Sequence, residues 1–356
     1  MLNFTVGPVQ TWPEILEIGR KQVPYFRNQA FSRLMLENEK IMKELAYATE
    51  SSRAVFLTAS GTGAMEAAVI NMFTSNDRVL IVDGGSFGHR FVKICQIHNI
   101  PFEVIKVPLE DDLTEDMLES YDNKKFTGFL VNMCETSTAK LYDMQMISDF
   151  CKKNNLFLIV DAVSAFLADP INMKKLEINI LLTGSQKALA LPPGISILLL
   201  DQRAVNRINK IPVNSIYFDL KEALKDGERG QTPFTPAVST LLQMNYRLKM
   251  VMRNGGVVSE NQRIAKIAAD FRERVVNLPV RLTGASLSNS VTALQLEGGK
   301  NAYKIFEILE KRYGIWICPN GGELKEKVFR VGHLGNLTIN DNKRLIEALE
   351  KVFAEL

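Results

Sequence analysis

The sequence predicts an α/β fold: a mostly parallel, seven-stranded sheet between helices, followed by a smaller α+β unit. Two observations predict it. Seven short apolar runs alternate with helical patterns up to residue 200, which is typical of parallel strands buried on both faces. After residue 236 the pattern changes to long helices and short strand-like pieces. The length of 356 residues suits one large unit with a smaller one attached.

In the first part, each strand is a short run rich in Val, Ile, Leu or Phe, and each helix has apolar residues at helical spacing. We expect strands at 54–58, 78–83, 102–107, 126–133, 156–161, 178–183 and 195–200, and helices at 64–73, 88–98, 114–120 and 144–153. The linker between the last two strands is too short for a crossover helix, so we expect that pair to be antiparallel.

In the second part, the periodicity predicts a small, mainly antiparallel sheet beside long helices. We expect helices at 237–253, 257–276, 301–313 and 341–354, and strands at 279–283, 290–296, 314–317 and 327–332. Asn340 is the expected N-cap of the last helix. The predicted organisation is an N-terminal segment, 1–15, packing near the active site, a large domain, 16–250, and a small domain, 251–356.

Composition argues against several classes of function. Lys and Arg total 43 and Asp and Glu 40, so the net charge of +3 gives no reason to expect nucleic acid or a membrane surface as partner. No apolar run is long enough to span a bilayer, and residues 1–13 lack a signal-peptide pattern, so we expect a cytoplasmic protein. The four cysteines and three histidines lack metal-ligand spacing, so we expect no metal.

Three motifs at strand ends point to chemistry. Residues 59–64 (ASGTGA) join a strand to a helix and form either an anion cradle or a tight turn. Asp161 ends an apolar strand, either as a ligand group or as a helix N-cap. Lys187 follows another strand, either as a desolvated amine suited to a Schiff base or as an exposed turn lysine. Together these groups match the needs of pyridoxal phosphate: a phosphate cradle, an acidic partner for the ring nitrogen and an amine for the aldehyde.

With these motifs in this order, the chain resembles the class V branch of the fold-type I pyridoxal-phosphate enzymes. Within that branch it is similar to the alanine–glyoxylate, serine–pyruvate and 2-aminoethylphosphonate–pyruvate aminotransferases. The most specific segments are 60–63 (SGTG), 161–164 (DAVS) and 184–187 (GSQK), the last followed by Pro-Pro-Gly. The resemblance extends from residues 5–8 to residues 331–335.

The resemblance implies roles around the cofactor ring. Lys187 would form the aldimine and carry the proton between the substrate Cα and the cofactor. Asp161 would pair with the pyridine nitrogen, and Val163 would pack under the ring. Phe87 would stack on the ring where the family often has tryptophan; a buried core phenylalanine is the alternative. Thr136 would approach the ring oxygen.

It also implies a phosphate site shared between two subunits. The phosphate would be held by Ser60, Gly61, Thr62 and Gln186. Thr235 would reach the phosphate of the neighbouring subunit, with Thr232 as the alternative, so the resemblance implies a homodimer with shared active sites.

For the substrate, Arg330 matches the family's arginine that binds the acidic group. Gly7 would close over the substrate. Arg27 lies where the family shapes its substrate pocket; it would either add a second positive charge that suits a phosphonate or face solvent. The overall character of the chain is somewhat closer to relatives that act on 2-aminoethylphosphonate than to strict glyoxylate enzymes.

The expected function is therefore amino-group transfer from 2-aminoethylphosphonate, alanine or serine to a keto acid such as pyruvate or glyoxylate, by a ping-pong aldimine mechanism. The alternative is a pyridoxal-phosphate lyase or cysteine desulfurase on the same fold. Desulfurases usually have a histidine before the lysine, where this chain has Gln186, and a cysteine on a flexible loop, whereas Cys318 lies at a strand end. A third possibility is a non-enzymatic regulator, but the sequence has no basic patch that would support it.

Overall fold

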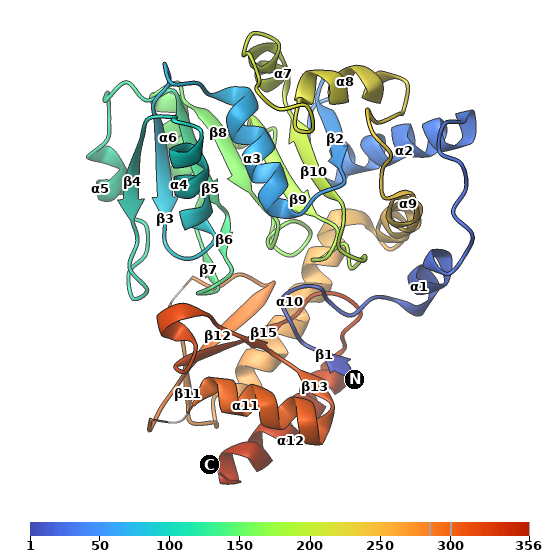
Figure 1. Cartoon of the computed structure of the whole chain (residues 1–356). Helices are drawn as coiled ribbons and strands as arrows, with labels where there is room; N and C mark the ends of the chain where they lie inside the picture. Colours follow the sequence, from blue (N-terminus) through green and yellow to red (C-terminus); the bar gives the residue numbers. More distant parts are fainter. Residues whose placement is uncertain (285, 300, 356) are drawn as a thin grey trace.

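The computed structural model describes residues 1–284, 286–299 and 301–355. The larger part of the molecule is built on a seven-stranded sheet (Figure 1). The strand order is β2 (Arg53–Leu57), β10 (Ser196–Leu200), β9 (Ile180–Gly184), β8 (Phe157–Asp161), β5 (Gly128–Asn132), β3 (Val79–Asp83) and β4 (Phe102–Lys106). This sheet confirms the α/β prediction.

One strand runs against the others. β10 is antiparallel to both β2 and β9, as its short connection to β9 predicted. The other strands share one direction, since β9, β8, β5, β3 and β4 pair in parallel and β2 is reversed twice through β10. Their carboxyl ends therefore meet at one edge of the sheet, which is where open α/β sheets place ligands.

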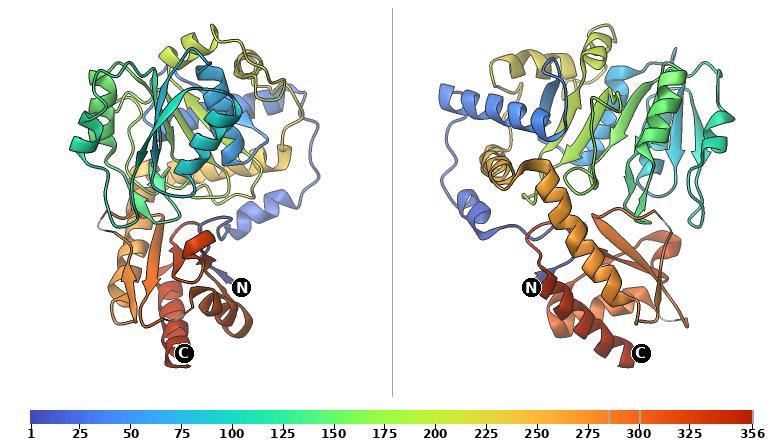
Figure 2. Two further views of the ribbon diagram at one scale, coloured as in Figure 1. Left: turned by 60° about the vertical axis from the view of Figure 1, so that its left-hand side comes forward. Right: turned by 180° about the vertical axis from the view of Figure 1, so that it is seen from behind.

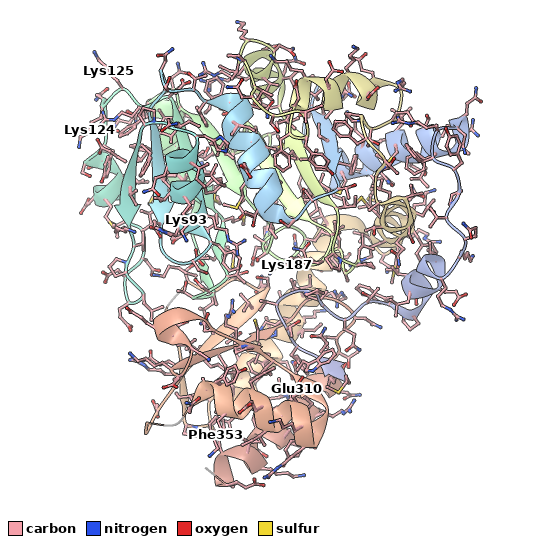
Figure 3. The ribbon with its side chains drawn as sticks, in the orientation of Figure 1. Lys93, Lys124, Lys125, Lys187, Glu310 and Phe353 are labelled. Carbon is pink, nitrogen blue, oxygen red and sulfur yellow. The ribbon has the colours of Figure 1, made fainter. Side chains whose placement is uncertain are left out.

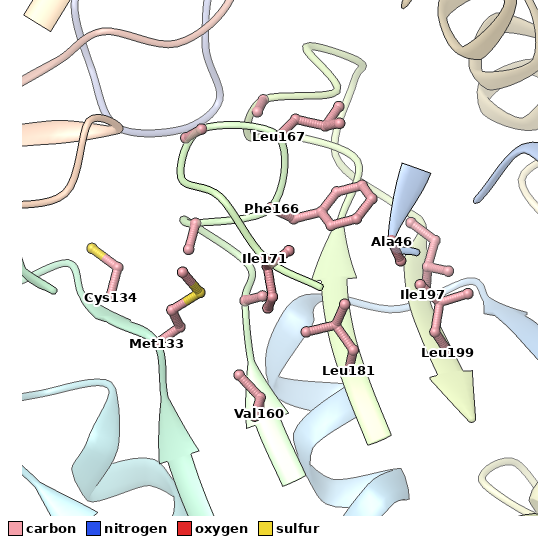
Figure 4. Close-up of a cluster of buried hydrophobic side chains, with 14 of the residues drawn as sticks. Ala46, Met133, Cys134, Val160, Phe166, Leu167, Ile171, Leu181, Ile197 and Leu199 are labelled. Carbon is pink, nitrogen blue, oxygen red and sulfur yellow. The ribbon is translucent and has the colours of Figure 1, made fainter. Parts of the chain in front are cut away.

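Helices cover both faces of the sheet (Figure 2). Side chains alternate along each strand, so Val79 and Ile81 enter one core while Leu80 and Val82 enter the other. The first core takes side chains from α3 (Gly61–Met72), α4 (Gly88–Ile97), α7 (Gln202–Ile208) and α8 (Leu220–Glu228). The second takes them from α2 (Gln29–Leu45), α5 (Glu115–Glu119), α6 (Met144–Lys153) and α9 (Val238–Arg253). Figure 4 shows part of this second core, where Val160, Leu181 and Leu199 from three adjacent strands lie near Phe166.

The C-terminal part is the predicted smaller unit, with an antiparallel sheet. Its strands are, in order, β11 (Val280–Leu282), β12 (Val291–Leu296), β15 (Val328–Gly332) and β14 (Cys318–Pro319), and its helices are α10 (Gly256–Val275), α11 (Ala302–Ile308) and α12 (Ile339–Glu355). A separate apolar core holds them together and includes Leu2 and Phe4 from the N-terminus.

Two predicted elements of this unit differ from the structure. The helix expected at 301–313 is α-helical to Ile308 and continues as a π-helix over Leu309–Tyr313. The strand expected at 314–317 is replaced by two short strands in different sheets. β13 (Ile315–Trp316) pairs with β1 (Leu2–Asn3), whereas β14 pairs with β15. Sequence periodicity cannot show such a change of partner, because it reports burial and not pairing.

The predicted cap of the last helix is also wrong. Helix α12 begins at Ile339, so Asn340 lies inside it. Thr338 occupies the capping position: its Oγ1 accepts a hydrogen bond from the N–H of Asp341 (3.3 Å), and Asp341 Oδ2 accepts one from the N–H of Thr338 (2.9 Å). This reciprocal pair is a capping box with Asp in the place of Glu.

Several elements were not predicted, among them α1 (Pro13–Gly19), α2 and the hairpin of β6 (Cys134–Glu135) and β7 (Lys140–Leu141). For α2 the signal was present, since the Asn28 side chain caps the helix by accepting from the N–H of Phe31. Within the described ranges, no helix combines the length and apolar character needed to cross a membrane. The same residues contain no group of three His, Cys, Asp or Glu placed to hold a metal ion.

Candidate active site

A cavity of about 100 Å³ lies at the carboxyl edge of the sheet, and most of the predicted site residues line it. Each comes from the segment that follows a strand, or from the strand's last residue, which is why residues distant in sequence meet here. The predicted residues that line it are Ser60, Gly61, Thr62, Phe87, Thr136, Asp161, Val163, Gln186 and Lys187. A larger hollow of about 730 Å³, between α6 and the start of α10, contains none of them.

Lys187 lies at the boundary between the large sheet and the C-terminal unit, as Figure 3 shows. It follows β9 and is only 6% exposed. Burial, and then the positive charge of Arg330, lower the pKa of the Lys187 amine from 10.5 to about 8. Among the described residues, its Nζ has no hydrogen-bond partner. A desolvated amine with a lowered pKa is the state that a nucleophilic lysine needs.

The N-terminal segment lies against this lysine. A Cβ on Gly7 would lie 2.9 Å from Lys187 Cδ, and the backbone φ of Gly7 is +143°, which favours glycine. The N–H of Val9 donates to the carbonyl of Gln186 (3.3 Å). The segment therefore forms one wall of the Lys187 environment.

Asp161 is the last residue of β8 and is 7% exposed. Its Oδ1 accepts a hydrogen bond from the N–H of Val163 (2.8 Å), and among the described residues Oδ2 has no partner. Burial raises the pKa of Asp161 to about 6, because a charged carboxylate is poorly solvated there. A buried carboxylate with one open oxygen is suited to pair with a positively charged nitrogen.

The first turn of α3 forms the other end of the cavity. Ser60 is the N-cap but its side chain makes no capping hydrogen bond, so the N–H groups of the first turn remain available. Gly61 lies against Val163, where an added Cβ would come within 2.9 Å of Val163 Cγ2. Free N–H groups and the positive end of the helix dipole favour a bound anion.

Phe87 and Thr136 also line the cavity. Phe87 presents its ring beside Arg90, whose guanidinium carbon lies 4.4 Å from the ring centroid. Thr136 Oγ1 forms a hydrogen bond with Ser164 Oγ (2.6 Å). Phe87 follows β3 of the large sheet, and Thr136 follows β6, the short strand that comes shortly after β5 in the sequence.

Arg330 lies in the central part of β15, 8% exposed, on the C-terminal unit. Its Nη1 donates to the carbonyl of Thr136 (3.1 Å) and its Nη2 to the carbonyl of Pro319 (2.8 Å). Nε is buried without a partner among the described residues. Two carbonyls fix the orientation of this buried guanidinium, so a carboxylate reaching its remaining N–H groups would be bound strongly.

Four predicted residues do not line the cavity. Gly7 and Arg330 contact residues that do, Lys187 and Thr136. The other two, Arg27 and Thr235, lie with different segments. Arg27 donates to Gln231 Oε1 (3.2 Å), to the carbonyl of Thr232 (2.8 Å) and to the carbonyl of Pro233 (3.1 Å). The Arg27 guanidinium is therefore bound to the loop that carries Thr235. Thr235 lines a different, small pocket between that loop and Tyr217.

Four residues line the cavity that the sequence did not suggest: Met65, Arg90, Cys134 and Ser164. Arg90 is the most informative of them. Its Nη1 donates to Thr62 Oγ1 (2.7 Å), so a cation adjoins the expected phosphate site. A basic residue shortly after Phe87 in the first turn of a strand-following helix was the available signal.

These residues fit pyridoxal phosphate. The open oxygen of Asp161, the unpartnered amine of Lys187 and the uncapped first turn of α3 surround one cavity. They supply a partner for a ring nitrogen, a nucleophile for an aldehyde and donors for a phosphate, which are the three groups of that cofactor.

Comparison with known proteins finds relatives over nearly the whole chain. The aminotransferase class-V family model matches residues 22–323. The protein named soluble hydrogenase, small subunit, of Synechococcus sp. (strain PCC 6716) is 30% identical, covering 96% of this chain and 90% of that protein. The L-aspartate–glyoxylate aminotransferase of Paracoccus denitrificans is 26% identical over 99% of this chain and 91% of its own length. The crystal structure of a subgroup IV aspartate aminotransferase from Thermus thermophilus superimposes with a TM-score of 0.92 at 27% identity, covering 100% of this chain and 99% of that one.

Proposed function

The chain belongs to the class-V aminotransferase family, and from this premise we propose that it moves the amino group of a small α-amino acid to a keto acid such as glyoxylate or pyruvate. The family is one of pyridoxal-phosphate transaminases, which confirms the predicted enzyme class. The name of the Synechococcus protein describes another activity, so the proposal rests on the family and on the site. The observation that carries it is the buried Lys187, which shares one cavity with Asp161.

Pyridoxal phosphate, when bound, supplies an aldehyde carbon and an electron-withdrawing ring that stabilises negative charge at the donor's Cα. Lys187 would hold the aldehyde, Asp161 would keep the ring nitrogen protonated, and Phe87 and Val163 would contact the ring. Ser60, Gly61, Thr62 and Gln186 would hold the phosphate, and Thr136 the ring oxygen. In this arrangement the residues would hold the cofactor at the carboxyl edge of the sheet and orient it toward the donor.

Lys187 would then act as the proton carrier. With its pKa lowered to about 8, a substantial fraction of the amine is neutral near that pH and can accept the proton from the donor's Cα. It would return the same proton to the adjacent cofactor carbon. Gly7 lies against the Lys187 side chain, and because it lacks a Cβ it leaves the space that Cδ and Cε of the lysine occupy.

The charges around the site favour an α-amino acid over a phosphonate. Arg330 would bind the single carboxylate of the donor or of the keto acid. A doubly charged phosphonate would call for a second cation, and Arg27 is engaged by the 231–233 backbone and side chains. We therefore place alanine and serine, which have a single carboxylate, before 2-aminoethylphosphonate.

We also propose that the enzyme works as a homodimer in which Thr235 serves the neighbouring site. Exposed apolar side chains beside that loop support the proposal: Ile216 is 84% exposed, and Tyr217 stacks on Phe234 with ring centroids 5.4 Å apart. Such exposed apolar patches are typical of protein–protein contact.

One absorbance experiment tests the function. Purified protein with bound pyridoxal phosphate should show a visible band, and one of alanine, serine, aspartate or 2-aminoethylphosphonate should convert it to a near-ultraviolet band that glyoxylate or pyruvate reverses. Conversion by the phosphonate alone would overturn the proposed donor class. Sulfide release from free cysteine, without conversion by any amino donor, would favour the lyase alternative instead.

A further inference from the structure

Glu135 is a fully buried carboxylate that the proposed chemistry does not use. It ends β6, directly before Thr136, and its exposed fraction is 0%. Lys140 is its cross-strand partner, but the Lys140 amine donates to the carbonyls of Pro108 and Asp111 instead. Among the described residues, no Lys or Arg donates a hydrogen bond to Glu135. A buried charge is costly to keep, so the groups that do satisfy it are informative.

Those groups come from the loop that carries Phe87. The N–H of Gly88 donates to Glu135 Oε2 (2.9 Å), and the N–H of Phe87 is directed at Oε1 over a longer distance of 3.4 Å. An added Cβ on Gly85 would lie 2.6 Å from Glu135 Cδ, so the loop passes directly over the carboxylate. Phe87 itself is the N-cap of α4 and provides no capping side chain. Glu135 therefore supplies from outside the acceptor that the start of this helix lacks.

The remaining donors fix the carboxylate itself. Asn132 Nδ2 donates to Oε2 (2.9 Å), and the Ser137 N–H donates to Oε1 (3.1 Å), as does the Ser137 hydroxyl. Ser137 Oγ also accepts from the N–H of Ser86 (3.3 Å). Both oxygens are thus held by groups of the sheet edge, and the carboxylate has a single orientation.

The same turn is joined to the proposed substrate arginine. The carbonyl of Thr136 accepts from Arg330 Nη1 (3.1 Å), and the carbonyl of Ser137 accepts from Asn320 Nδ2 (3.0 Å). Glu135 consequently stands between two parts of the site: the 85–88 loop on one side and the Arg330 strand on the other.

We propose that Glu135 is a positioning residue, whose carboxylate sets the ring of Phe87 against the cofactor and sets the 136–137 turn against Arg330. This inference rests on the proposed function. It predicts that Glu135 affects cofactor binding mainly through Phe87, and donor binding through the carbonyl of Thr136.

The test measures the dissociation constant of pyridoxal phosphate, and the visible circular dichroism of the bound cofactor, in wild type and in Glu135→Gln. The amide presents N–H groups where only donors face it, so we expect roughly tenfold weaker cofactor binding. We expect an altered dichroism band, because the ring is held at another angle, and a higher KM for alanine. Glu135→Asp should recover part of each effect.

A double-mutant cycle separates positioning from general loss of stability. If Glu135 acts through Phe87, the effects of Glu135→Gln and Phe87→Ala on cofactor affinity should be clearly non-additive. Glu39→Gln is the matched control, since Glu39 is a buried carboxylate that accepts from Arg53 and Ala54 far along the sheet. It should lower the melting temperature and leave cofactor affinity unchanged.

A second variant keeps the test possible if Glu135→Gln does not fold. Ser137→Ala removes the hydroxyl that donates to Glu135 and accepts from the N–H of Ser86, and it should weaken cofactor binding several-fold.

The outcomes distinguish this inference from the proposed function. A wild-type protein that binds no pyridoxal phosphate would overturn the proposed function itself. A wild type that binds it, together with a Glu135→Gln variant of unchanged affinity, dichroism and KM, would overturn the positioning role alone. Additive effects in the cycle would show that Glu135 does not act through Phe87.

Discussion

At the scale of single residues, the amine of Lys187 should titrate well below an ordinary lysine. Its pKa is lowered to about 8 by burial first and by Arg330 second. The neutral, reactive form gains population as pH rises, so the rate at which cofactor-free protein develops a visible band with pyridoxal phosphate should increase through pH 8. Stopped-flow absorbance between pH 6 and 10 measures it. A rate that still rises without levelling at pH 10, as for an ordinary lysine, would contradict the burial of this amine.

Arg330 offers a second prediction at this scale. In Arg330→Lys the charge remains but the two-pronged geometry is lost, and the carbonyls of Thr136 and Pro319 lose their donors. KM for the amino donor should rise roughly a hundredfold while the visible cofactor band persists. Arg281→Lys, at an exposed arginine paired with Glu110, is the control and should leave KM unchanged. An unchanged KM in Arg330→Lys would remove Arg330 from the substrate site.

Much of the site could be predicted at this scale, because its residues follow strand ends in short motifs. Asp161 ends an apolar strand and Lys187 lies in the short turn after another, and the structure places both in one cavity. Arg90 and Glu135 were not predicted, because their significance lies in contacts between distant segments. Nothing in the local sequence distinguishes Glu135, because its role depends on the 85–88 loop, which lies over it only in the folded structure.

At the scale of elements, the start of α12 allows a test of which residue caps this helix, Thr338 or Asn340. Thr338 and Asp341 form the capping box, whereas Asn340 lies within the first turn. Thr338→Ala should cost about 1 kcal/mol of unfolding free energy. Asn340→Ala should change it by less than about 0.5 kcal/mol. Urea unfolding followed by circular dichroism measures both, and equal losses would contradict the cap assigned here.

The N-terminal segment is the element with the most direct effect on Lys187. In Gly7→Ala the new methyl group would meet Lys187 Cδ, at a φ of +143° that alanine rarely adopts. Rates of the donor half-reaction should fall roughly tenfold or more, because the amine is displaced. Gly321→Ala is the control, since no atom lies within 4 Å of the added Cβ. Equal rates in both variants would show that the segment does not constrain Lys187.

Helices and strands could be predicted from the sequence where buried residues recur at a regular spacing. They could not be predicted where the conformation depends on which strand a segment pairs with. Strands of the large sheet follow their apolar runs closely, and the antiparallel β10 followed from a short linker. The single strand predicted at 314–317 is wrong because β13 and β14 belong to different sheets, and β13 pairs with residues 2 and 3 from the other end of the sequence.

At the scale of the whole molecule, the shared site makes a prediction for mixed dimers. Lys187→Ala should be inactive, and Thr235→Asp should be weak because its charge repels the phosphate. If Thr235 serves the neighbouring subunit, a mixed dimer has one site with both residues intact. Co-refolded variants should therefore be clearly more active than the sum of each alone, as measured by keto-acid formation. Activity equal to that sum would mean that each subunit's site is self-contained.

We propose the division into residues 1–15, 16–250 and 251–356 as the working description of the molecule. The C-terminal unit has an apolar core distinct from the two that flank the large sheet, and α10 leads into it from Gly256. Lys187 and Arg330 lie on opposite sides of this boundary, so a relative movement of the two units would change the space between the amine and the guanidinium.

The pairing of β1 with β13 also bears on how the protein is made. Leu2 and Asn3 leave the ribosome long before their partners, Ile315 and Trp316. Until then Phe4, which is fully buried in the finished fold, has no core to enter. The large sheet can form around Lys187 while its N-terminal cover is still unattached. During translation the reactive lysine would therefore stay open to cellular aldehydes, pyridoxal phosphate among them, and the cover would close last.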